Sequence, residues 1–563
     1  MAQRGWPSIL ASGLLPGLLA GAHLAGLVFF LNPEVPFNGA TVGRGILLYG
    51  GLGGAATLAV LLLVLVARPS QAESAGRILP WGLLCALAGA AVLDWAHAAY
   101  FAYLLPPGIN QRLIKTALWL TMGGVIAFYV ALLHTLRRRP YGISSRFVLA
   151  AVSVLSVVAM LERRDAYEPP HGRRTVPAIA EPDARPGLWL IGLDGATLDA
   201  VLPLASEGRL PFFAALIAEG AYGRLESITP TRPESLWTTV ATGKLPYKHG
   251  VLGAEVHPAD LLAPGAELSL LPKWIGFRHW GTFGGGSRPP DPGRRRASAA
   301  WEILWRLGQR TGVTAWPATF PATPEVSYAV TDSFFDGLPA VGEIRPADLA
   351  ELAQRPTPTA ENPAEQDLPA WLTGALLADR RRLAMAEAAT DGVRLEGADF
   401  LFLPGLARVS ERTYGGFEAA LFSGSRAEED LQAAARLTAC YEELDRALGE
   451  LWKRRATARR LLAVVSANGV APRGSGVAGR LSGQRDGLLI LRGPGIRQGA
   501  ILSGARLVDV VPTVLYWSGF PVARDFDGQV LTAAFTEQLL AARPLAFLPS
   551  YEGALLPGAP TGR

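Results

Sequence analysis

Five long apolar stretches in the first 161 residues constrain the fold of this chain more than any other feature. They lie near residues 8–31, 44–67, 78–104, 113–136 and 144–161. A helix needs about 20 residues to cross the roughly 30 Å of hydrocarbon in a bilayer. We therefore predict an N-terminal bundle of about five transmembrane helices over residues 1–161. The first stretch is too long for a signal peptide and lacks a small-residue cleavage site, which indicates an uncleaved anchor.

A cluster of ionisable residues falls within the third and fourth predicted spans. Asp94 and His97 lie one helical turn apart in the third span, and Lys115 lies early in the fourth. Ionisable groups at such depth are costly and often functional, so a ligand or ion site is one interpretation. The other is a structural ion pair or hydrogen bond between neighbouring helices. We favour the structural one, because no matching chain of polar residues extends this cluster into a path.

The basic residues of the short loops suggest an orientation, since cytoplasmic loops carry an excess of Lys and Arg. With the N-terminus inside, the cytoplasmic side would carry Arg4, Arg68, Arg77, Arg137, Arg138, Arg139 and Arg146. The other side would carry Arg44, Arg112 and Lys115. This bias predicts an integral protein of the bacterial inner membrane with an extracytoplasmic C-terminal domain. The residues after the last span argue against it, and they are Arg163, Arg164, Arg173 and Arg174.

Charge and cysteine content exclude two classes of function. The chain has 53 Lys and Arg against 48 Asp and Glu, and no long basic run interleaved with aromatic residues. We therefore predict no nucleic-acid partner. The two cysteines, Cys85 and Cys440, are too few for a disulfide framework or a cysteine-rich zinc module.

From residue 187 the pattern changes to short apolar strands that alternate with amphipathic helical stretches. This alternation predicts an α/β domain over 187–540, with a largely parallel central sheet flanked by helices. The stretch 162–186 is rich in Pro, Arg and Glu and is expected to be a linker. Residues 541–563 are expected to form a C-terminal tail.

An insertion at 253–297, rich in Pro and Gly, interrupts the α/β pattern. Its aromatic residues Trp274, Trp280 and Phe283 lie near several arginines, which is a composition typical of a contact surface. A glycine-rich surface loop packed by its own aromatic residues fits equally well.

Eight motifs follow one another in the globular part. They are I-G-L-D-G-A-T at 191–197, W-T-T-V-A-T-G-K-L-P-Y-K-H-G at 237–250, A-A-W-E-I-L at 299–304 with V-T-A-W-P-A-T-F-P at 313–321, F-L-F-L-P-G-L-A-R-V-S-E-R at 400–412, L-L-A-V-V-S-A-N-G at 461–469, L-L-I-L-R-G-P-G-I at 488–496 and L-V-D-V-V-P-T-V-L at 507–515. Together they resemble the alkaline phosphatase superfamily, in particular its type I phosphodiesterase and nucleotide pyrophosphatase branch. The resemblance covers about 187–535. It implies an alkaline-phosphatase-like fold and a hydrolase that uses two metal ions and a Thr or Ser nucleophile.

Most site residues that the resemblance calls for are replaced in this chain. Asp194 alone matches a family metal ligand. The replaced positions are Pro233 for the nucleophile, and Ala407, Glu411, Ala467, Asn468 and Gln484 for carboxylate and imidazole ligands. All seven histidines precede residue 280, whereas the family's His ligands come from the second half of the domain. A tight zinc site without imidazoles or thiolates is improbable, so we predict no catalytic residues and no cofactor.

A rebuilt site is the alternative. Thr231 and Ser235 flank Pro233 and are weak candidates for a relocated nucleophile. An oxygen-only site for magnesium or calcium could use Asp194, Glu234 and Glu411. A capping box explains T-R-P-E at 231–234 more simply, with Thr231 as the N-cap and Pro233 in the first turn.

These observations predict a membrane-anchored pseudoenzyme with an alkaline-phosphatase-like fold. It would be a structural or interaction subunit of a membrane assembly, in contact with lipid and with other membrane-protein subunits. The alternative is an active metal-dependent phosphodiesterase or phosphatase-type hydrolase or transferase. Such an enzyme would act on an envelope or lipid phosphate or sulfate ester, with zinc or magnesium in a rearranged site.

Overall fold

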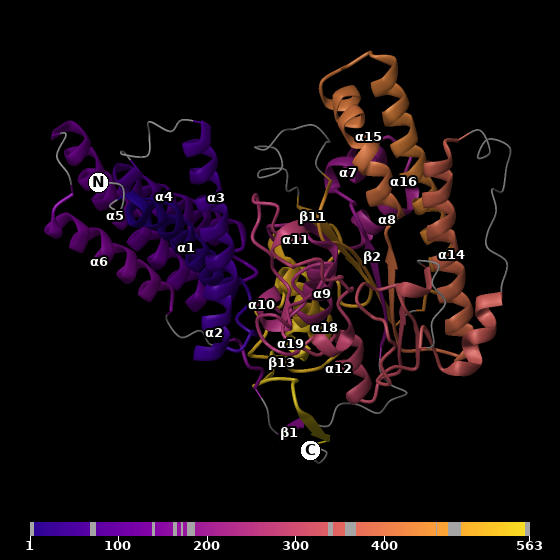
Figure 1. Cartoon of the computed structure of the whole chain (residues 1–563). Helices are drawn as coiled ribbons and strands as arrows, with labels where there is room; N and C mark the ends of the chain where they lie inside the picture. Colours follow the sequence, from indigo (N-terminus) through magenta and orange to yellow (C-terminus); the bar gives the residue numbers. More distant parts are fainter. Residues whose placement is uncertain are drawn as a thin grey trace. The chain divides into compact units, whose positions relative to one another are not determined.

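The computed structural model describes residues 5–67, 75–137, 141–161, 166–170, 173–176, 186–335, 342–354, 368–457, 459–470 and 486–557. The chain divides into two compact units (Figure 1). The first consists of Met1–Glu168 and Glu255–Pro289, and the second of Pro169–Ala254 and Pro290–Arg563.

The N-terminal part of the first unit is helical. Its helices are α1 (Gly5–Leu31), α2 (Gly39–Gly45), the short π-helix η2 (Ile46–Gly50), α3 (Gly51–Ala67), α4 (Ala75–Tyr100), α5 (Pro107–Arg137) and α6 (Ile143–Met160). Among the residues that the structure describes, five segments are long and apolar enough to cross a membrane, and α2, η2 and α3 together form one of them. The prediction of five spans is confirmed. The fourth span begins at Pro107, six residues before its predicted start at 113.

Glycines allow α1 to pack backbone against backbone with η2 and α3. A Cβ atom added to Gly17 would lie 2.0 Å from the carbonyl oxygen of Gly53, and one added to Gly21 would lie 2.1 Å from that of Tyr49. Small residues at helix contacts permit such close approach in membranes. Any larger residue at these two positions would therefore force the helices apart.

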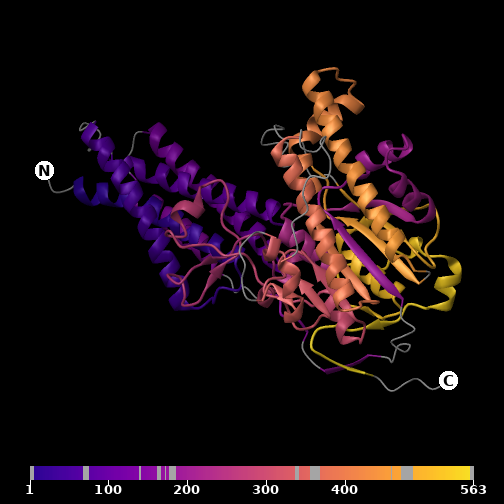
Figure 2. The ribbon, with the colours of Figure 1, turned by 90° about the vertical axis from the view of Figure 1, so that its right-hand side faces the viewer.

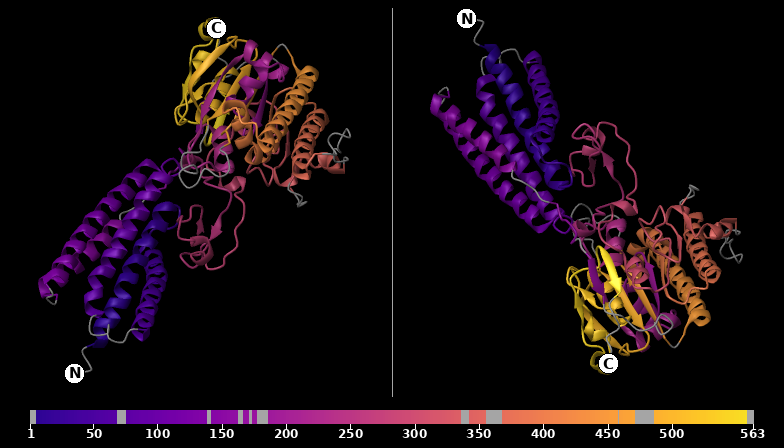
Figure 3. Two further views of the ribbon diagram at one scale, coloured as in Figure 1. Left: turned by 90° about the horizontal axis from the view of Figure 1, so that it is seen from above. Right: turned by 90° about the horizontal axis from the view of Figure 1, so that it is seen from below.

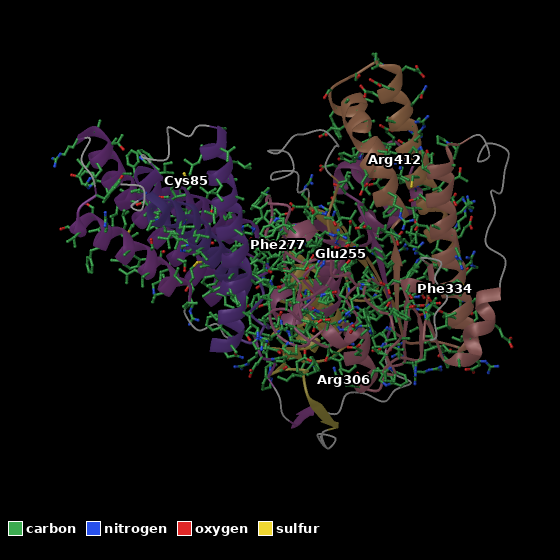
Figure 4. All side chains as sticks on the ribbon, viewed as in Figure 1. Cys85, Glu255, Phe277, Arg306, Phe334 and Arg412 are labelled. Carbon is green, nitrogen blue, oxygen red and sulfur yellow. The ribbon has the colours of Figure 1, made fainter. Side chains whose placement is uncertain are left out.

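The inserted segment Glu255–Pro289 belongs to this first unit. It contains the short strands β4 (His257–Pro258) and β5 (Glu267–Leu268) and the single-turn helix α11 (Phe277–Trp280). Its buried residues Leu262, Leu268 and Phe277 share one core with α1 and η2. Figure 3 shows the segment beside the N-terminal helices in both views, and Phe277 is labelled in Figure 4. The sequence prediction counted this segment as part of the globular domain, because no local pattern reveals which core a loop joins.

Hydrogen bonds to three polar side chains fix the insertion. Asn32, which directly follows α1, donates to the carbonyl oxygen of Leu270 at 2.8 Å. Its side-chain oxygen accepts from the backbone N–H groups of Ser269 at 2.8 Å and Leu270 at 3.0 Å. Tyr49 donates to the carbonyl oxygen of Gly281 at 3.0 Å. The loop backbone thus obtains partners where it would otherwise be buried without them.

His97 supplies a further hydrogen bond to the loop. Its Nδ1 donates to the carbonyl oxygen of Leu93 at 2.6 Å, and its Nε2 accepts from the backbone N–H of Lys273 at 2.8 Å. Trp274 packs edge-on against the same imidazole at 5.0 Å between ring centres, although 57% of this side chain is exposed. His97 therefore makes a structural hydrogen bond, as we favoured, but its partner is the insertion and not a neighbouring helix.

The described residues of the second unit form a sheet of nine strands in the order β12-β3-β11-β10-β2-β9-β6-β7-β8. The strands are β2 (Gly187–Leu193), β3 (Ala221–Glu226), β6 (Thr311–Thr314), β7 (Tyr328–Val330), β8 (Ile344–Arg345), β9 (Ala398–Leu403), β10 (Arg460–Ser466), β11 (Gly487–Arg492) and β12 (Ala500–Arg506). The neighbours β10, β2, β9, β6 and β7 run parallel, as do β3 and β12. Strand β11 is antiparallel to both of its neighbours, and β8 to β7. The prediction of a largely parallel sheet flanked by helices is confirmed.

Helices cover both faces of this sheet. One face packs against α7 (Leu198–Ser206), α8 (Pro211–Glu219), α14 (Ala370–Gly392), α15 (Gly405–Phe422) and α16 (Glu428–Arg455). The other packs against α9 (Pro233–Thr242), α12 (Ala300–Arg306) and α18 (Val510–Trp517). All seven residues of β2 are buried. Figure 2 shows α15 and α16, in orange, as a pair that extends beyond the sheet.

The domain continues past residue 540, where the sequence prediction placed a tail. Helix α19 (Glu537–Ala542) is followed by β14 (Phe547–Leu548), which pairs with β13 (Val522–Ala523), and by β15 (Ala554–Pro557). Strand β15 pairs with β1 (Arg173–Val176), which lies within the predicted linker 162–186. These pairings are between residues far apart in sequence, so the composition of either segment could not reveal them.

We predict that Asn32→Ala loosens the insertion. The substitution removes three hydrogen bonds to Ser269 and Leu270, and each bond contributes about 1 kcal/mol. Tryptic cleavage after Lys273 and Arg278 in the detergent-solubilised chain should become at least about fivefold faster, because proteolysis follows the population of the open form.

Asn38→Ala is the matched control, because the side chain of Asn38 accepts from Thr41 at the start of α2 and makes no hydrogen bond to the insertion. Equal cleavage rates in both variants and the native chain would contradict the role assigned to Asn32.

Candidate functional site

The candidate site lies where three neighbouring parallel strands end. Strands β10, β2 and β9 are in register, with Val465 beside Gly192 and Leu193 beside Leu403. Ligand sites in open α/β sheets lie outside these carboxyl ends. The strands therefore bring together the residues that follow them, namely Asp194 after β2, Ala407 in the first turn of α15 after β9, and Ala467 and Asn468 after β10.

The turn after β2 packs directly against α15. Gly195 has a φ of 80°, a conformation that glycine adopts at little cost. A Cβ atom added there would lie 2.8 Å from Cα of Ala407 and 2.9 Å from Val470. The backbone of α15 thus approaches the turn that carries Asp194, in the space that a larger side chain at this turn would need.

Asp194 is buried, and its carboxylate accepts a hydrogen bond from another side chain. The indole Nε1 of Trp237, which lies on α9, donates to Asp194 Oδ1 at 3.3 Å. Burial raises the pKa of Asp194 to about 6, and the charges of Glu234 and Glu411 add to this shift. The bond from Trp237 and the charge of Arg408 lower the pKa of Asp194 by less. The carboxyl group therefore titrates near neutral pH.

The start of α9 differs from the predicted capping box. The N-cap residue is Arg232, and its side chain makes no capping hydrogen bond. It donates instead to the carbonyl oxygen of Leu252 at 2.9 Å. Pro233 is the first helical residue and is exposed, as is Thr231. The prediction of Thr231 as the N-cap is wrong, because the extended backbone of Arg232 delays the helix by one residue.

Ser235 lies in the first turn of α9, where it is only 1% exposed. Its hydroxyl has no hydrogen-bond partner among the described residues. The nearby His249, in the short helix α10 (Pro246–His249), is fully buried and does not bond this hydroxyl. Its Nε2 lies 3.0 Å from the hydroxyl of Thr239, and its Nδ1 accepts from the backbone of Val251 at 3.2 Å.

The same burial keeps His249 neutral. Burial lowers the pKa of His249 to about 3, and the positive charges of Arg295 and Arg296 contribute to this shift. A neutral imidazole could in principle act as a base, but a general base must reach the hydroxyl that it activates. In this structure Ser235 and His249 do not form a nucleophile and base pair.

Residues 467–470, the described part of the segment after β10, contain no charged group. Ala467 is fully buried. The side-chain nitrogen of Asn468 donates to the carbonyl oxygen of Gly469 at 2.9 Å, and its backbone oxygen accepts from Ser466 at 2.9 Å. Gln484 lies outside the described residues.

The described residues do not fit the two-metal site that the fold family implies. Two metal ions need several carboxylates and imidazoles that converge from different strand ends. Pro233, Ala407 and Ala467 have no side-chain donor atoms. Within the described part of the chain, no three His, Cys, Asp or Glu residues are grouped in a way that could hold a metal ion. Glu411 is exposed on α15, and its charge acts on Asp194 at a distance.

One buried carboxylate near the site was missed by the sequence analysis. Asp379 on α14 accepts from the backbone N–H of Gly405 through both oxygens, at 3.0 and 3.1 Å. It therefore satisfies the first turn of α15, where N–H groups lack helical partners. Burial raises the pKa of Asp379 to about 7, and the charge of Arg382 opposes this shift. No local signal could identify it, because Asp379 and Gly405 are joined only by the packing of α14 against α15.

We predict that Asp194→Asn stabilises the chain above pH 6. The asparagine keeps an oxygen for Trp237 Nε1 but has no charge to bury. A carboxyl with a raised pKa makes the native state less stable as pH rises from about 4 to about 6, and the value of about 6 for Asp194 corresponds to a loss of up to about 3 kcal/mol.

Thermal unfolding of the full chain in detergent should show a higher Tm for the variant at pH 7.5 and no difference at pH 4. A lower Tm at pH 7.5 would contradict this account, because that result requires the carboxylate to have a favourable partner in the native protein.

Comparison with known proteins assigns about half of the chain to a family. A model of the type I phosphodiesterase/nucleotide pyrophosphatase family matches residues 188–474. No curated protein sequence matches the chain.

Solved structures with a similar fold include three hydrolases. Murine ectonucleotide pyrophosphatase/phosphodiesterase 5, in an inactive form with AMP, is 11% identical, with 62% of this chain and 100% of that chain covered at a TM-score of 0.40. A mutant of the alkaline phosphatase PafA is 13% identical, with 62% and 99% covered at a TM-score of 0.40. The phosphonate monoester hydrolase of Silicibacter pomeroyi is 14% identical, with 62% and 76% covered at a TM-score of 0.36. These likenesses concern the fold alone. Because the family model matches just over half of the chain, the chain belongs to the type I phosphodiesterase/nucleotide pyrophosphatase family.

Proposed function

We propose that this chain is a membrane-anchored pseudoenzyme of its family and acts as a structural or interaction subunit of a membrane assembly. One observation carries the proposal. At the carboxyl ends of β2, β9 and β10, the family's donor positions hold Ala407 and Ala467, while the surviving carboxylate of Asp194 is buried and bonded to Trp237. A fold can persist without its chemistry, because its core and its site are separate constraints.

The hydroxyl groups near the site support the same proposal. Ser235 is buried, and its neighbour His249 is bonded to Thr239. Thr231 reaches solvent, yet an attacking hydroxyl needs an adjacent base or metal. Hydrolysis by a rearranged site would therefore require movement of α9.

The proposed setting is a bilayer, with the globular domain on the side opposite the N-terminus. Successive spans alternate in direction, so the first residues of α1, α4 and α6 lie on one side. Arg137 and Arg146 belong to that side, and Arg44, Arg112 and Lys115 to the other. With the N-terminus in the cytoplasm of a bacterium, the residues after α6 would be extracytoplasmic.

We expect the purified chain to carry no stoichiometric metal and to have no turnover. The test is elemental analysis for zinc, magnesium, manganese and calcium after purification without chelators, followed by assays with phosphodiester, phosphomonoester and sulfate-ester substrates. Any slow background rate should be unchanged in Asp194→Asn.

An active phosphatase of the same superfamily, purified in parallel, shows that the method retains metal. Stoichiometric metal, or turnover that Asp194→Asn abolishes, would contradict the pseudoenzyme proposal and favour the metal-dependent hydrolase.

The paired helices α15 and α16 offer a surface for the proposed interaction. Where they meet, the apolar side chains of Leu421, Phe422 and Leu431 are 36%, 56% and 40% exposed. Further down α15, Arg412 lies with its guanidinium 5.0 Å from the ring of Trp371, which fixes the helix to α14 (Figure 4). We call the surface formed by Leu421, Phe422 and Leu431 the tip of the helix pair. An exposed apolar surface of this kind is suited to contact another protein.

We predict that the double variant Leu421→Ser and Phe422→Ser loses co-purifying membrane proteins, because it removes the apolar contact area of the tip. Its Tm should match that of the native chain, since both residues are exposed. The measurement is quantitative affinity purification from native membranes in mild detergent. Leu202→Ser is the matched control, because Leu202 on α7 is 37% exposed at another part of the same domain. Equal recovery of partners in both variants would refute a role for the tip.

A further inference from the structure

A cavity of about 1,110 Å³ lies among the N-terminal helices α1, α4 and α6. It exceeds the roughly 300–1,000 Å³ of typical small-molecule pockets. Its walls are mostly apolar residues of α1 and α6, including Leu15, Leu18 and Val154, which are 45%, 40% and 61% exposed. These side chains therefore leave a large apolar surface uncovered by the chain.

The cavity is elongated along the helices. On α1 its lining runs from Pro7 to Ala22, and on α6 from Arg146 to Val158. At 1.5 Å per helical residue these stretches are about 23 Å and about 18 Å long. The cavity thus reaches more than half-way across a hydrocarbon layer of roughly 30 Å.

Toward the C-terminal ends of α1 and α6, the cavity is closed by direct contacts between these two helices. His23 Nε2 on α1 lies 3.1 Å from the hydroxyl oxygen of Ser156 on α6. A Cβ atom added to Gly26 would lie 2.7 Å from Cε of Met160. Beyond these residues the two helices touch, so the cavity does not cross the whole membrane. A spanning helix of another protein would need a groove along its full length.

The opposite end of the cavity, where α1 and α6 begin, is polar and positively charged. Ser8, Tyr141 and Arg146 line it, and all three belong to the side on which α1, α4 and α6 begin. Arg146 is exposed and forms no ion pair among the described residues. A guanidinium and a phenol hydroxyl at the mouth of an apolar cavity suit a phosphate, because arginine binds phosphate oxygens through paired N–H groups.

We propose that this cavity binds one phospholipid with an anionic headgroup. An acyl chain lies along the apolar walls between α1 and α6, and the headgroup phosphate contacts Arg146 and Tyr141 at the end where these helices begin. The lipid would complete the packing of α6, because the contacts with α1 described above lie toward the C-terminal ends of both helices. This inference concerns the N-terminal unit alone and is independent of the function proposed for the globular domain.

The test uses the full chain, purified from membranes in mild detergent, and native mass spectrometry with phosphatidylglycerol and phosphatidylcholine in competition. The native chain should retain one phospholipid and prefer phosphatidylglycerol by about fivefold, which corresponds to about 1 kcal/mol for one basic side chain near a lipid headgroup. Arg146→Gln should still retain a phospholipid but lose this preference. Arg137→Gln is the matched control, since Arg137 lies on the same side but does not line the cavity.

Filling the cavity tests the acyl chain separately. Ala150→Trp on α6 and Ala11→Trp on α1 should each abolish retention of the lipid, because both alanines line the cavity. Leu155→Trp, at an α6 position outside the lining, should leave retention unchanged and shows whether the helix tolerates tryptophan. A photo-reactive residue at Leu15 should cross-link to lipid.

Three results of these measurements would overturn the proposal, in addition to the cross-linking result given below. They are a native chain without bound phospholipid, filled variants that retain it as the native chain does, and an unchanged preference in Arg146→Gln. A cross-link from Leu15 to another polypeptide would equally overturn it, since the occupant would then be a protein.

Discussion

Burial of the central strand from both faces is the constraint on which the rest of the globular domain depends. In β2, Leu188 and Leu190 point into the core formed with α9, α12 and α18. Trp189, Ile191 and Leu193 point into the core formed with α7, α8 and the long helices. Parallel strands covered on both sides must be apolar at every position. Catalytic or metal-binding side chains can therefore be accommodated only where the strands end, and substitutions there leave both cores intact.

Because of this separation, the sequence predicted the fold better than the site. The apolar run Leu188 to Leu193 predicted β2 to within one residue, since a doubly buried strand has an unmistakable composition. The same holds for the five apolar spans, whose lengths alone identify them. The replacements at Pro233, Ala407 and Ala467 were also evident from sequence, because an absent donor atom needs no geometry. What the remaining residues do depends on contacts that only the structure provides.

Long-range contacts account for the predictions that differ from the structure. Asn32 holds Leu270, and no local pattern connects these residues across 238 positions. The capping box failed for a different reason, since Thr231 and Glu234 have the right spacing but the backbone of Arg232 is extended. Spacing in sequence describes a capping box only when the helix begins where the motif requires it.

Lys244 shows how a motif of the family can be retained for structural reasons. It follows α9 in T-G-K-L-P, and its Nζ contacts Asp525 at 2.7 Å and Glu552 at 2.8 Å. Burial lowers the pKa of Lys244, but the two carboxylates outweigh burial and the pKa is raised overall. Burial likewise raises the pKa of Glu552, and Lys244 outweighs it, so that pKa is lowered. A lysine whose pKa is raised on folding stabilises the native state until the pH rises past that pKa. A glutamate whose pKa is lowered on folding stabilises the native state until the pH falls past that pKa. The cluster therefore holds the C-terminal segment to α9 across the neutral range.

This cluster also bears on whether α9 could move to rebuild a catalytic site. To expose Ser235, the first turn of α9 would have to leave the core that contains Trp237, and the bond from Trp237 to Asp194 would break. Lys244 fixes the other end of the same helix to the buried Glu552 and the partly buried Asp525, and breaking a buried ion pair costs about 3–5 kcal/mol. Thr239, in the middle of the helix, is bonded to the buried His249. A helix restrained at its start, middle and end is suited to hold the sheet and poorly suited to present a nucleophile.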